Sequence, residues 1–144
     1  MDRIKIYLAD DDKEDREFLL EALDEIPLRT QVTQFNNGVD LMDKLFSDEV
    51  LPDVIFLDLY MPIMDGFECL TDIRNFAKFA NIHVIVYSTT YRQREVNQLK
   101  EDGANQFIQK STSFKTLKTL IHKSLCNTSL SNELKKDNEF IILK

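Results

Sequence analysis

Polar side chains suited to binding a cation or a phosphoryl group stand at the ends of four apolar runs. The run Val54–Asp58 (VIFLD) ends on a carboxylate, and a loop rich in turn-forming residues follows it. Strands buried on both faces of a parallel sheet have this apolar character, so their last residues emerge at the carboxyl edge of the sheet. In open α/β sheets, ligands bind at that edge. Three other apolar runs lead in the same way to Asp10 and Asp11, to Ser88, and to Lys110.

Three carboxylates at one edge of a sheet predict a site for a hard cation. Asp10, Asp11 and Asp58 would repel one another unless a cation neutralised them, and oxygen ligands at a partly hydrated site suit Mg²⁺. Protonated Lys110 cannot bind a metal, so we expect it to act as a point charge beside carboxylate or phosphoryl oxygen. Ser88 can donate a hydrogen bond to the same oxygen. In-line attack by Asp58 on phosphorus would give an aspartyl phosphate, helped mainly by positioning and charge neutralisation.

These side chains need a scaffold, and the sequence predicts one in which short strands alternate with amphipathic helices. The predicted strands are residues 4–9, 31–35, 54–58, 83–88 and 106–109. The predicted helices are residues 12–25, 39–46, 66–79, 93–102 and a last helix capped by Thr112 or Ser113. Asp12 is expected to cap the first helix, and Asp65-Gly66 to turn the chain into the third. The alternation indicates an α/β fold, a doubly wound five-stranded parallel sheet with helices on both faces.

Length and charge narrow the classes of function. A chain of 144 residues that is 43% hydrophobic can form one domain with a proper core. Eighteen basic residues against 25 acidic residues leave a net charge of −7, which argues against nucleic-acid binding as the main task. No apolar run reaches the ~18 residues of a membrane span, and the first residues do not resemble a signal peptide. We therefore expect a cytoplasmic protein without a membrane partner.

Over about residues 4–126, the sequence resembles the receiver domains of two-component response regulators. The resemblance rests on four motifs, which are YLADDD, FLDLYMPIMDGFE, VIVYSTT and ANQFIQK. Each motif is modest alone, but all four stand at strand ends in the family's order. The resemblance implies a flavodoxin-like receiver fold in which Asp58 accepts a phosphoryl group from a histidine kinase or phosphotransfer protein. It implies a regulator whose output is a changed protein-binding surface, and no enzyme activity beyond its own phosphorylation and dephosphorylation.

The resemblance also assigns roles to the other residues of the site. It implies that Mg²⁺ is held by Asp10, Asp11, Asp58 and the backbone carbonyl of Tyr60, with Asp11 as a direct ligand. The resemblance also implies that Ser88 is the switch hydroxyl, that Lys110 contacts the phosphoryl group and that Phe107 occupies the aromatic switch position.

Three positions depart from the family pattern. Ser111 follows Lys110 where the family usually has proline, often after a cis peptide bond. A non-proline cis bond costs ~3 kcal/mol, so the sequence leaves open whether this peptide is cis or trans. Tyr60 lies two residues beyond Asp58, and Thr89 follows Ser88 where the family favours a small residue. We predict that these two side chains narrow access to Asp58 and slow both small phosphodonors and attacking water.

Two other classes of function stay open at this point. One is a receiver-like protein-binding module that is never phosphorylated. The other is an aspartate-nucleophile phosphohydrolase, which Asp58-x-Tyr60 resembles only slightly, because those enzymes need a second aspartate where this chain has Tyr60. Which kinase and which downstream protein would serve this chain is not written in the sequence.

The C-terminal residues carry a separate prediction. We assign residues 1–126 to the receiver domain and residues 127–144 to a C-terminal tail, with no output domain after residue 126. The tail ends in the apolar run Phe140-Ile141-Ile142-Leu143, which favours β structure and would promote aggregation if left in water. We expect it to pack on its own domain or to hold a homodimer, with a disordered tail carrying a short motif as the alternative.

Overall fold

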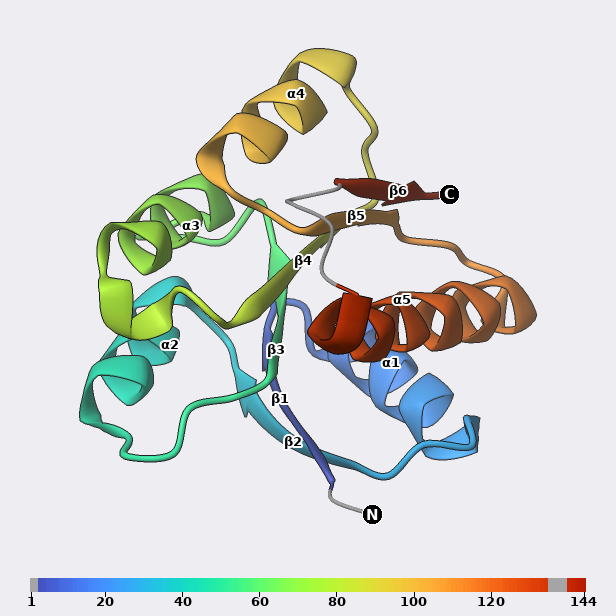
Figure 1. The fold of residues 1–144 in the computed structure, drawn as a ribbon. Helices are drawn as coiled ribbons and strands as arrows, with labels where there is room; N and C mark the ends of the chain where they lie inside the picture. Colours follow the sequence, from blue (N-terminus) through green and yellow to red (C-terminus); the bar gives the residue numbers. More distant parts are fainter. Residues whose placement is uncertain (1–2, 135–139) are drawn as a thin grey trace.

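The computed structural model describes residues 3–134 and 140–144, with the backbone alone for residues 129–134. Its sheet is parallel throughout, and the strand order is β2-β1-β3-β4-β5-β6 (Figure 1). The strands are β1 (Ile4–Ala9), β2 (Thr30–Phe35), β3 (Val54–Asp58), β4 (His83–Ser88), β5 (Gln106–Gln109) and β6 (Ile141–Leu143). The predicted doubly wound α/β fold is confirmed, and the central strands begin and end where the sequence pattern places them.

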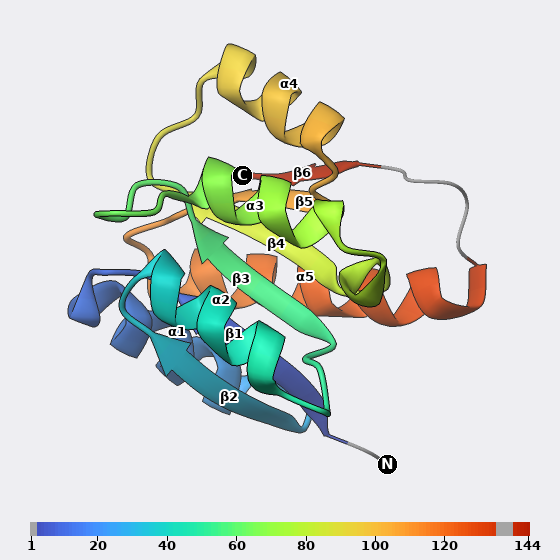
Figure 2. The same cartoon turned by 90° about the vertical axis from the view of Figure 1, so that its left-hand side faces the viewer.

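Helices cover both faces of this sheet (Figures 1 and 2). One face carries α1 (Lys13–Glu25) and α5 (Phe114–Leu134). The other carries α2 (Gly38–Ser47), α3 (Gly66–Asn75) and α4 (Gln93–Asp102), with a short 3₁₀ helix, η1 (Ala77–Phe79), after α3. Each face has its own hydrophobic core, because neighbouring residues of a buried strand point to opposite sides. In β3, for example, Ile55 and Leu57 belong to the core under α2, α3 and α4, whereas Phe56 belongs to the other core.

Local signals position the helix ends near the site. Asp12 caps α1, since its side chain accepts the backbone N–H groups of Glu14 and Asp15. Asp65 caps α3 through a capping box with Glu68. Both helices therefore start at the carboxyl edge of the sheet, beside the strand ends that carry the predicted site residues.

Three details of the scaffold differ from the sequence prediction. The sheet has six strands rather than five, because Ile141–Leu143 pairs in parallel with β5. The third helix ends at Asn75 rather than at residue 79, because Phe76 is extended and η1 follows separately. The last helix continues to Leu134, so the expected domain boundary at residue 126 falls inside α5. The apolar end of the tail thus packs on its own domain.

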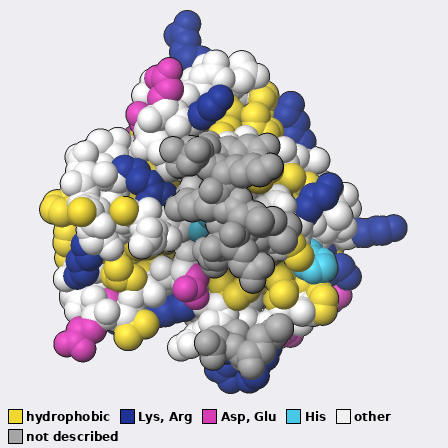
Figure 3. All heavy atoms as spheres, viewed as in Figure 1, with side chains coloured by type: hydrophobic (Ala, Val, Ile, Leu, Met, Phe, Trp, Pro, Cys, Tyr) yellow, Lys and Arg dark blue, Asp and Glu magenta, His cyan; other side chains and the backbone are white. Residues whose placement is uncertain are grey.

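The described surface is mixed in character. On the face shown in Figure 3, basic, acidic and hydrophobic side chains alternate around the area drawn in grey. Within the described residues, no helix is both long and apolar enough to cross a membrane.

Candidate functional site

The predicted site residues meet where the strand order reverses. β1 pairs with β2 on one side and with β3 on the other, so the carboxyl ends of β1 and β3 lie side by side at the position where open α/β sheets bind ligands. Asp10 follows β1, and Asp58 is the last residue of β3. One carboxylate oxygen from each of Asp10, Asp11 and Asp58 lies within 4.8 Å of the other two. The sheet topology therefore assembles the acidic cluster that the sequence predicts.

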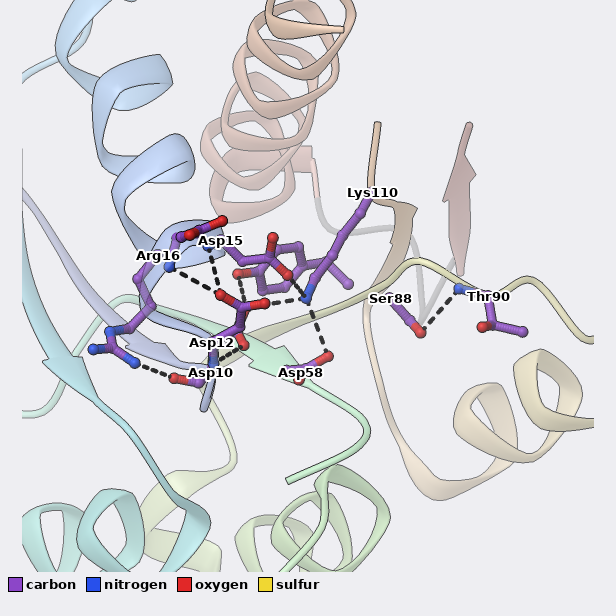
Figure 4. Close-up of polar contacts among 10 residues, drawn as sticks. Asp10, Asp12, Asp15, Arg16, Asp58, Ser88, Thr90 and Lys110 are labelled. Atoms are coloured by element: carbon purple, nitrogen blue, oxygen red, sulfur yellow. Dashed lines mark hydrogen bonds and ion pairs between the residues drawn. The ribbon is translucent and has the colours of Figure 1, made fainter. Parts of the chain in front are cut away.

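Lys110 closes this cluster from the end of β5 (Figure 4). Its ammonium lies 3.4 Å from Asp58 Oδ1, 3.0 Å from Asp10 Oδ2 and 2.9 Å from Asp15 Oδ2. Its Nζ also lies 4.5 Å from the centre of the Tyr87 ring. The side chain is 11% exposed, so these ion pairs are screened little by solvent. Lys110 is thus positioned to compensate negative charge on Asp58 or on a group attached to it.

The two adjacent acidic residues have different surroundings. Asp10 is fully buried, and its Oδ1 accepts the N–H of Asp12 at 2.9 Å. Its Oδ2 accepts the Tyr87 hydroxyl at 2.5 Å in addition to the Lys110 contact. Asp11 is exposed to solvent. The structure therefore makes Asp11 the carboxylate most able to reach a hydrated cation, whereas Asp10 is held by protein donors.

The environment of Asp58 disfavours its charged form. The side chain is almost fully buried, and this burial, opposed by Lys110 and reinforced by Asp10 and Asp11, raises the pKa of Asp58 from 3.8 to about 7. A cation bound between these carboxylates would stabilise the charged form of Asp58 and so oppose this rise in its pKa. The donor set thus fits Mg²⁺, which prefers carboxylate oxygen and retains several waters.

Ser88 and Phe107 lie on the neighbouring strands β4 and β5. Ser88 ends β4, is 1% exposed, and accepts the backbone N–H of Thr90 on its Oγ at 3.3 Å. Its carbonyl accepts the N–H of Lys110 at 2.8 Å, which connects the ends of β4 and β5. Phe107 is fully buried on β5 and contacts Tyr91 edge-on, with ring centroids 5.7 Å apart. The ring at the predicted aromatic switch position therefore lies inside the core in this structure.

The loop after Asp58 packs directly under the site. A Cβ added to Gly66 would lie 2.4 Å from the carbonyl oxygen of Asp58, so glycine is required for this close approach. Ile63 adopts a φ of 71°, unusual for a β-branched residue, and Met64 N–H bonds to the Pro62 carbonyl at 2.8 Å. Pro62 and Gly66 thus shape an ordered loop, as the sequence predicts.

Tyr60 reaches from this loop to the start of α4. Its hydroxyl lies 2.6 Å from both carboxylate oxygens of Glu95 and accepts a hydrogen bond from Arg92 at 3.1 Å. The side chain stays 45% exposed. Tyr60 therefore connects the loop that follows Asp58 to the start of α4.

Sequence reasoning missed two residues of the site. Asp15 lies in the first turn of α1 and carries no motif signal, yet its carboxylate binds Lys110. Tyr87 was part of an apolar strand, yet its hydroxyl binds buried Asp10. A tyrosine within a fully buried strand needs a hydrogen-bond partner, and this requirement is the signal that could have identified it.

The peptide between Lys110 and Ser111 is trans, as are the other peptide bonds of the described residues. The question left open by the missing proline is therefore answered. Lys110 still reaches Asp58 at 3.4 Å with this backbone.

A doubly wound α/β fold with an acidic cluster at the ends of β1 and β3 and a lysine at the end of β5 defines the class of protein. The sequence model of the response regulator receiver domain matches residues 6–122. The chain belongs to this family.

Known relatives include chemotaxis proteins and a sensor kinase. The chain is 28% identical over 120 residues to the sensor histidine kinase CheAY of Helicobacter pylori, covering 83% of this chain and 15% of the kinase. It is 39% identical over 79 residues to the chemotaxis protein CheY of Listeria monocytogenes, covering 55% of this chain and 63% of that protein. The chain thus spans less than two thirds of either relative.

Solved structures show the same fold. The phosphorylated cyanobacterial phytochrome response regulator RcpA is 29% identical, with a TM-score of 0.79 over 91% of this chain and 96% of that chain. The Mn²⁺-bound form of response regulator Rcp1 is 26% identical, with a TM-score of 0.75 over 83% of this chain and 89% of that chain.

Proposed function

We propose that this receiver domain accepts a phosphoryl group on Asp58 in a Mg²⁺-dependent reaction and signals through a changed protein-binding surface. The observation that carries the proposal is the cluster of three carboxylates whose oxygens lie within 4.8 Å, with the Lys110 ammonium 3.4 Å from Asp58. RcpA, a relative with the same fold, is described as phosphorylated, and Rcp1 as Mn²⁺-bound, which supports this assignment.

The chain's own residues account for the chemistry. A carboxylate oxygen of Asp58 forms a bond to phosphorus while the bond from phosphorus to the donor breaks, leaving an acyl phosphate and the released donor. Lys110 compensates charge on the phosphoryl oxygens, and Ser88 donates its hydroxyl to one of them. Asp11, Asp58 and the carbonyl of Tyr60 would hold Mg²⁺, with Asp10 beside them. The bound cation would neutralise the charge that builds up during transfer.

The donor proposed for this reaction is a phosphohistidine on a histidine kinase or phosphotransfer protein. Asp58 is only 6% exposed, so a donor must bring its phosphoryl group to a largely buried carboxylate. The new dianionic charge at a buried position then attracts Ser88 and Lys110 and reorganises the loop after β4. The downstream partner binds this loop in its altered conformation.

Intact-mass spectrometry tests the proposal. The wild-type chain, incubated with Mg²⁺ and a small phosphodonor or a promiscuous histidine kinase, should gain one phosphoryl adduct. Asp58→Asn should gain none, whereas Asp24→Asn, which removes an exposed carboxylate of α1, should react like wild type. Absence of an adduct with either donor, together with no Mg²⁺-dependent beryllofluoride binding, would reject phosphorylation and favour an unphosphorylated binding module.

A further inference from the structure

The C-terminal strand lies beside β5 as the outermost strand of the sheet (Figures 1 and 2). Gln106, Phe107 and Ile108 pair with Ile141, Ile142 and Leu143, and Ile141 N–H bonds to the Asn105 carbonyl at 3.2 Å. An edge of this kind offers unpaired backbone groups to any extended segment. Residues 141–143 therefore occupy a strand-binding position that the five-stranded core would leave open.

Side chains of this segment pack on both faces of the sheet. Ile141 and Leu143 pack with the core under α1 and α5, and Leu143 is 9% exposed. Phe140 packs with the opposite core, which also contains Phe107 and contacts Tyr91. The segment is thus held by alternate side chains as well as by backbone pairing.

Tyr91 joins the C-terminal segment to the loop between β4 and α4. The Lys144 ammonium lies 3.7 Å from the centre of the Tyr91 ring, within the range of a cation–π contact. The same ring packs edge-on against Phe107 and donates its hydroxyl to Gln93 at 3.0 Å. Movement of Tyr91 would therefore alter the contact with Lys144 and the packing against Phe107, which belongs to the core that Phe140 packs against.

Tyr91 is also one residue away from a contact with the switch hydroxyl. Thr90 N–H donates to Ser88 Oγ at 3.3 Å, and Figure 4 shows this pair beside Asp58 and Lys110. A phosphoryl group on Asp58 would recruit the Ser88 hydroxyl and pull Oγ away from Thr90. The loop that carries Thr90 and Tyr91 would then lose a hydrogen bond that stabilises its present conformation.

We propose that the β5 edge and Tyr91 form a docking site for the chain's own residues 140–144, and that phosphorylation of Asp58 weakens this docking through Ser88, Thr90 and Tyr91. The inference rests on the proposed function of Asp58. Release of the segment would uncover the β5 edge for a strand of a downstream partner, which is the β-augmentation mode of peptide recognition. Because coupling between two sites is reciprocal, loss of the docked segment should favour the phosphorylated form.

Hydrogen exchange on the full chain tests the coupling. The amides of Ile141 and Leu143, which alternate toward β5, should exchange about fivefold faster when Mg²⁺ and beryllofluoride are added, because the docked segment becomes less populated. Fluorine NMR of the same sample reports whether beryllofluoride is bound. Unchanged exchange with bound beryllofluoride would overturn the docking proposal, whereas no bound beryllofluoride would reject the proposed function itself.

A matched pair of variants tests the reciprocal effect. Leu143→Asp places a charge at a buried position of β6 and should tighten Mg²⁺-dependent beryllofluoride binding by about fivefold. Ile142→Asp lies in the same strand, but its side chain is 39% exposed, so its affinity should stay near that of wild type. Equal affinities for Leu143→Asp and wild type would overturn the proposal.

Light scattering identifies the occupant of the β5 edge. With beryllofluoride bound, the mass should remain that of one chain while residues 141–143 lose protection. A doubled mass with residues 141–143 still protected would overturn the proposal, because the segment would then have passed to a second copy.

Discussion

The Lys110 ammonium lies 2.9 Å from the Asp15 carboxylate, closer than its 3.4 Å contact with Asp58. Asp15 therefore competes with the phosphoacceptor candidate for the one lysine at the end of β5. Burial opposes the charge of Lys110, but the carboxylates of Asp58 and Asp10 outweigh it and raise the pKa of the lysine above its ordinary value. The ammonium stays charged at neutral pH and is shared among several carboxylates.

Removal of the Asp15 carboxylate should stabilise the phosphorylated state relative to the unphosphorylated state. Asp15→Asn leaves Lys110 to Asp10 and Asp58, so we expect Mg²⁺-dependent beryllofluoride binding to tighten by about fivefold. Calorimetric titration measures the affinity. Glu14→Gln is the matched control, since it removes an exposed charge from the same helical turn while leaving the Lys110 contacts intact. A similar gain in both variants would attribute the effect to net charge rather than to release of Lys110.

Substitutions of the neighbouring carboxylates Asp10 and Asp11 should affect different properties: Mg²⁺ binding for Asp11 and the free energy of unfolding for Asp10. Asp11 is exposed, so Asp11→Asn should weaken Mg²⁺ binding by about tenfold or more while changing the free energy of unfolding little. Asp10→Asn changes a buried acceptor for Tyr87, Lys110 and the Asp12 amide, so it should lower the free energy of unfolding by about 2–4 kcal/mol. Urea denaturation in EDTA and calorimetry with Mg²⁺ measure the two effects. Equal loss of stability in both variants would contradict this division of roles.

The sequence sufficed to locate the site because backbone topology places its parts. Strands of β-branched and apolar residues, each followed by a polar residue, required Asp10, Asp58, Ser88 and Lys110 to meet at one edge once the sheet was parallel. The helix cap at Asp12 was likewise local and predictable. Features that depend on strand topology and on local helix capping could thus be predicted from the sequence alone.

Contacts between residues far apart in the sequence could not be predicted in this way. Whether Asp15 turns toward Lys110 or back toward its own helix depends on a charge about 95 residues away in sequence. The sixth strand was foreseen only as an apolar segment that must pack somewhere, because the open edge of β5 exists only after the sheet has formed. Long-range partners of this kind require the assembled fold.

The raised pKa of Asp58 predicts that the phosphoacceptor candidate destabilises the metal-free fold. The native state holds this proton up to a pKa of about 7, whereas the unfolded chain releases it near the ordinary value of 3.8. Between these values the native state binds more protons, so the free energy of unfolding falls as pH rises. Asp58→Asn removes this slope, and its stabilising effect should be about 2–3 kcal/mol larger at pH 8 than at pH 5.

Urea denaturation in EDTA at the two pH values measures this difference. Asp24→Asn, the exposed control on α1, should show nearly the same effect at both. A gain from Asp58→Asn that does not depend on pH would indicate that the carboxylate is ionised throughout, and would contradict the assigned cause.

Access to Asp58 should be limited by Tyr60 and Thr89. Tyr60 is anchored through its hydroxyl to Glu95 at 2.6 Å, and Thr89 is exposed directly after Ser88 at the end of β4. The double variant Tyr60→Ala, Thr89→Ala should shorten the half-life of the phosphoryl group several-fold, because water then reaches the acyl phosphate more readily. Decay of the adduct, followed by intact mass after removal of the donor, gives the half-life.

A second variant separates coverage by the Tyr60 ring from its anchoring to α4. Tyr60→Phe keeps the ring but removes the hydroxyl that binds Glu95 and Arg92. If coverage alone protects the phosphoryl group, Tyr60→Phe should match wild type. If anchoring is needed to hold the ring in place, its half-life should fall toward that of Tyr60→Ala. We expect the second result, since a residue that is 45% exposed has little packing to hold its ring in place once its hydrogen bonds are lost. An unchanged half-life in the double alanine variant would contradict both forms of the argument.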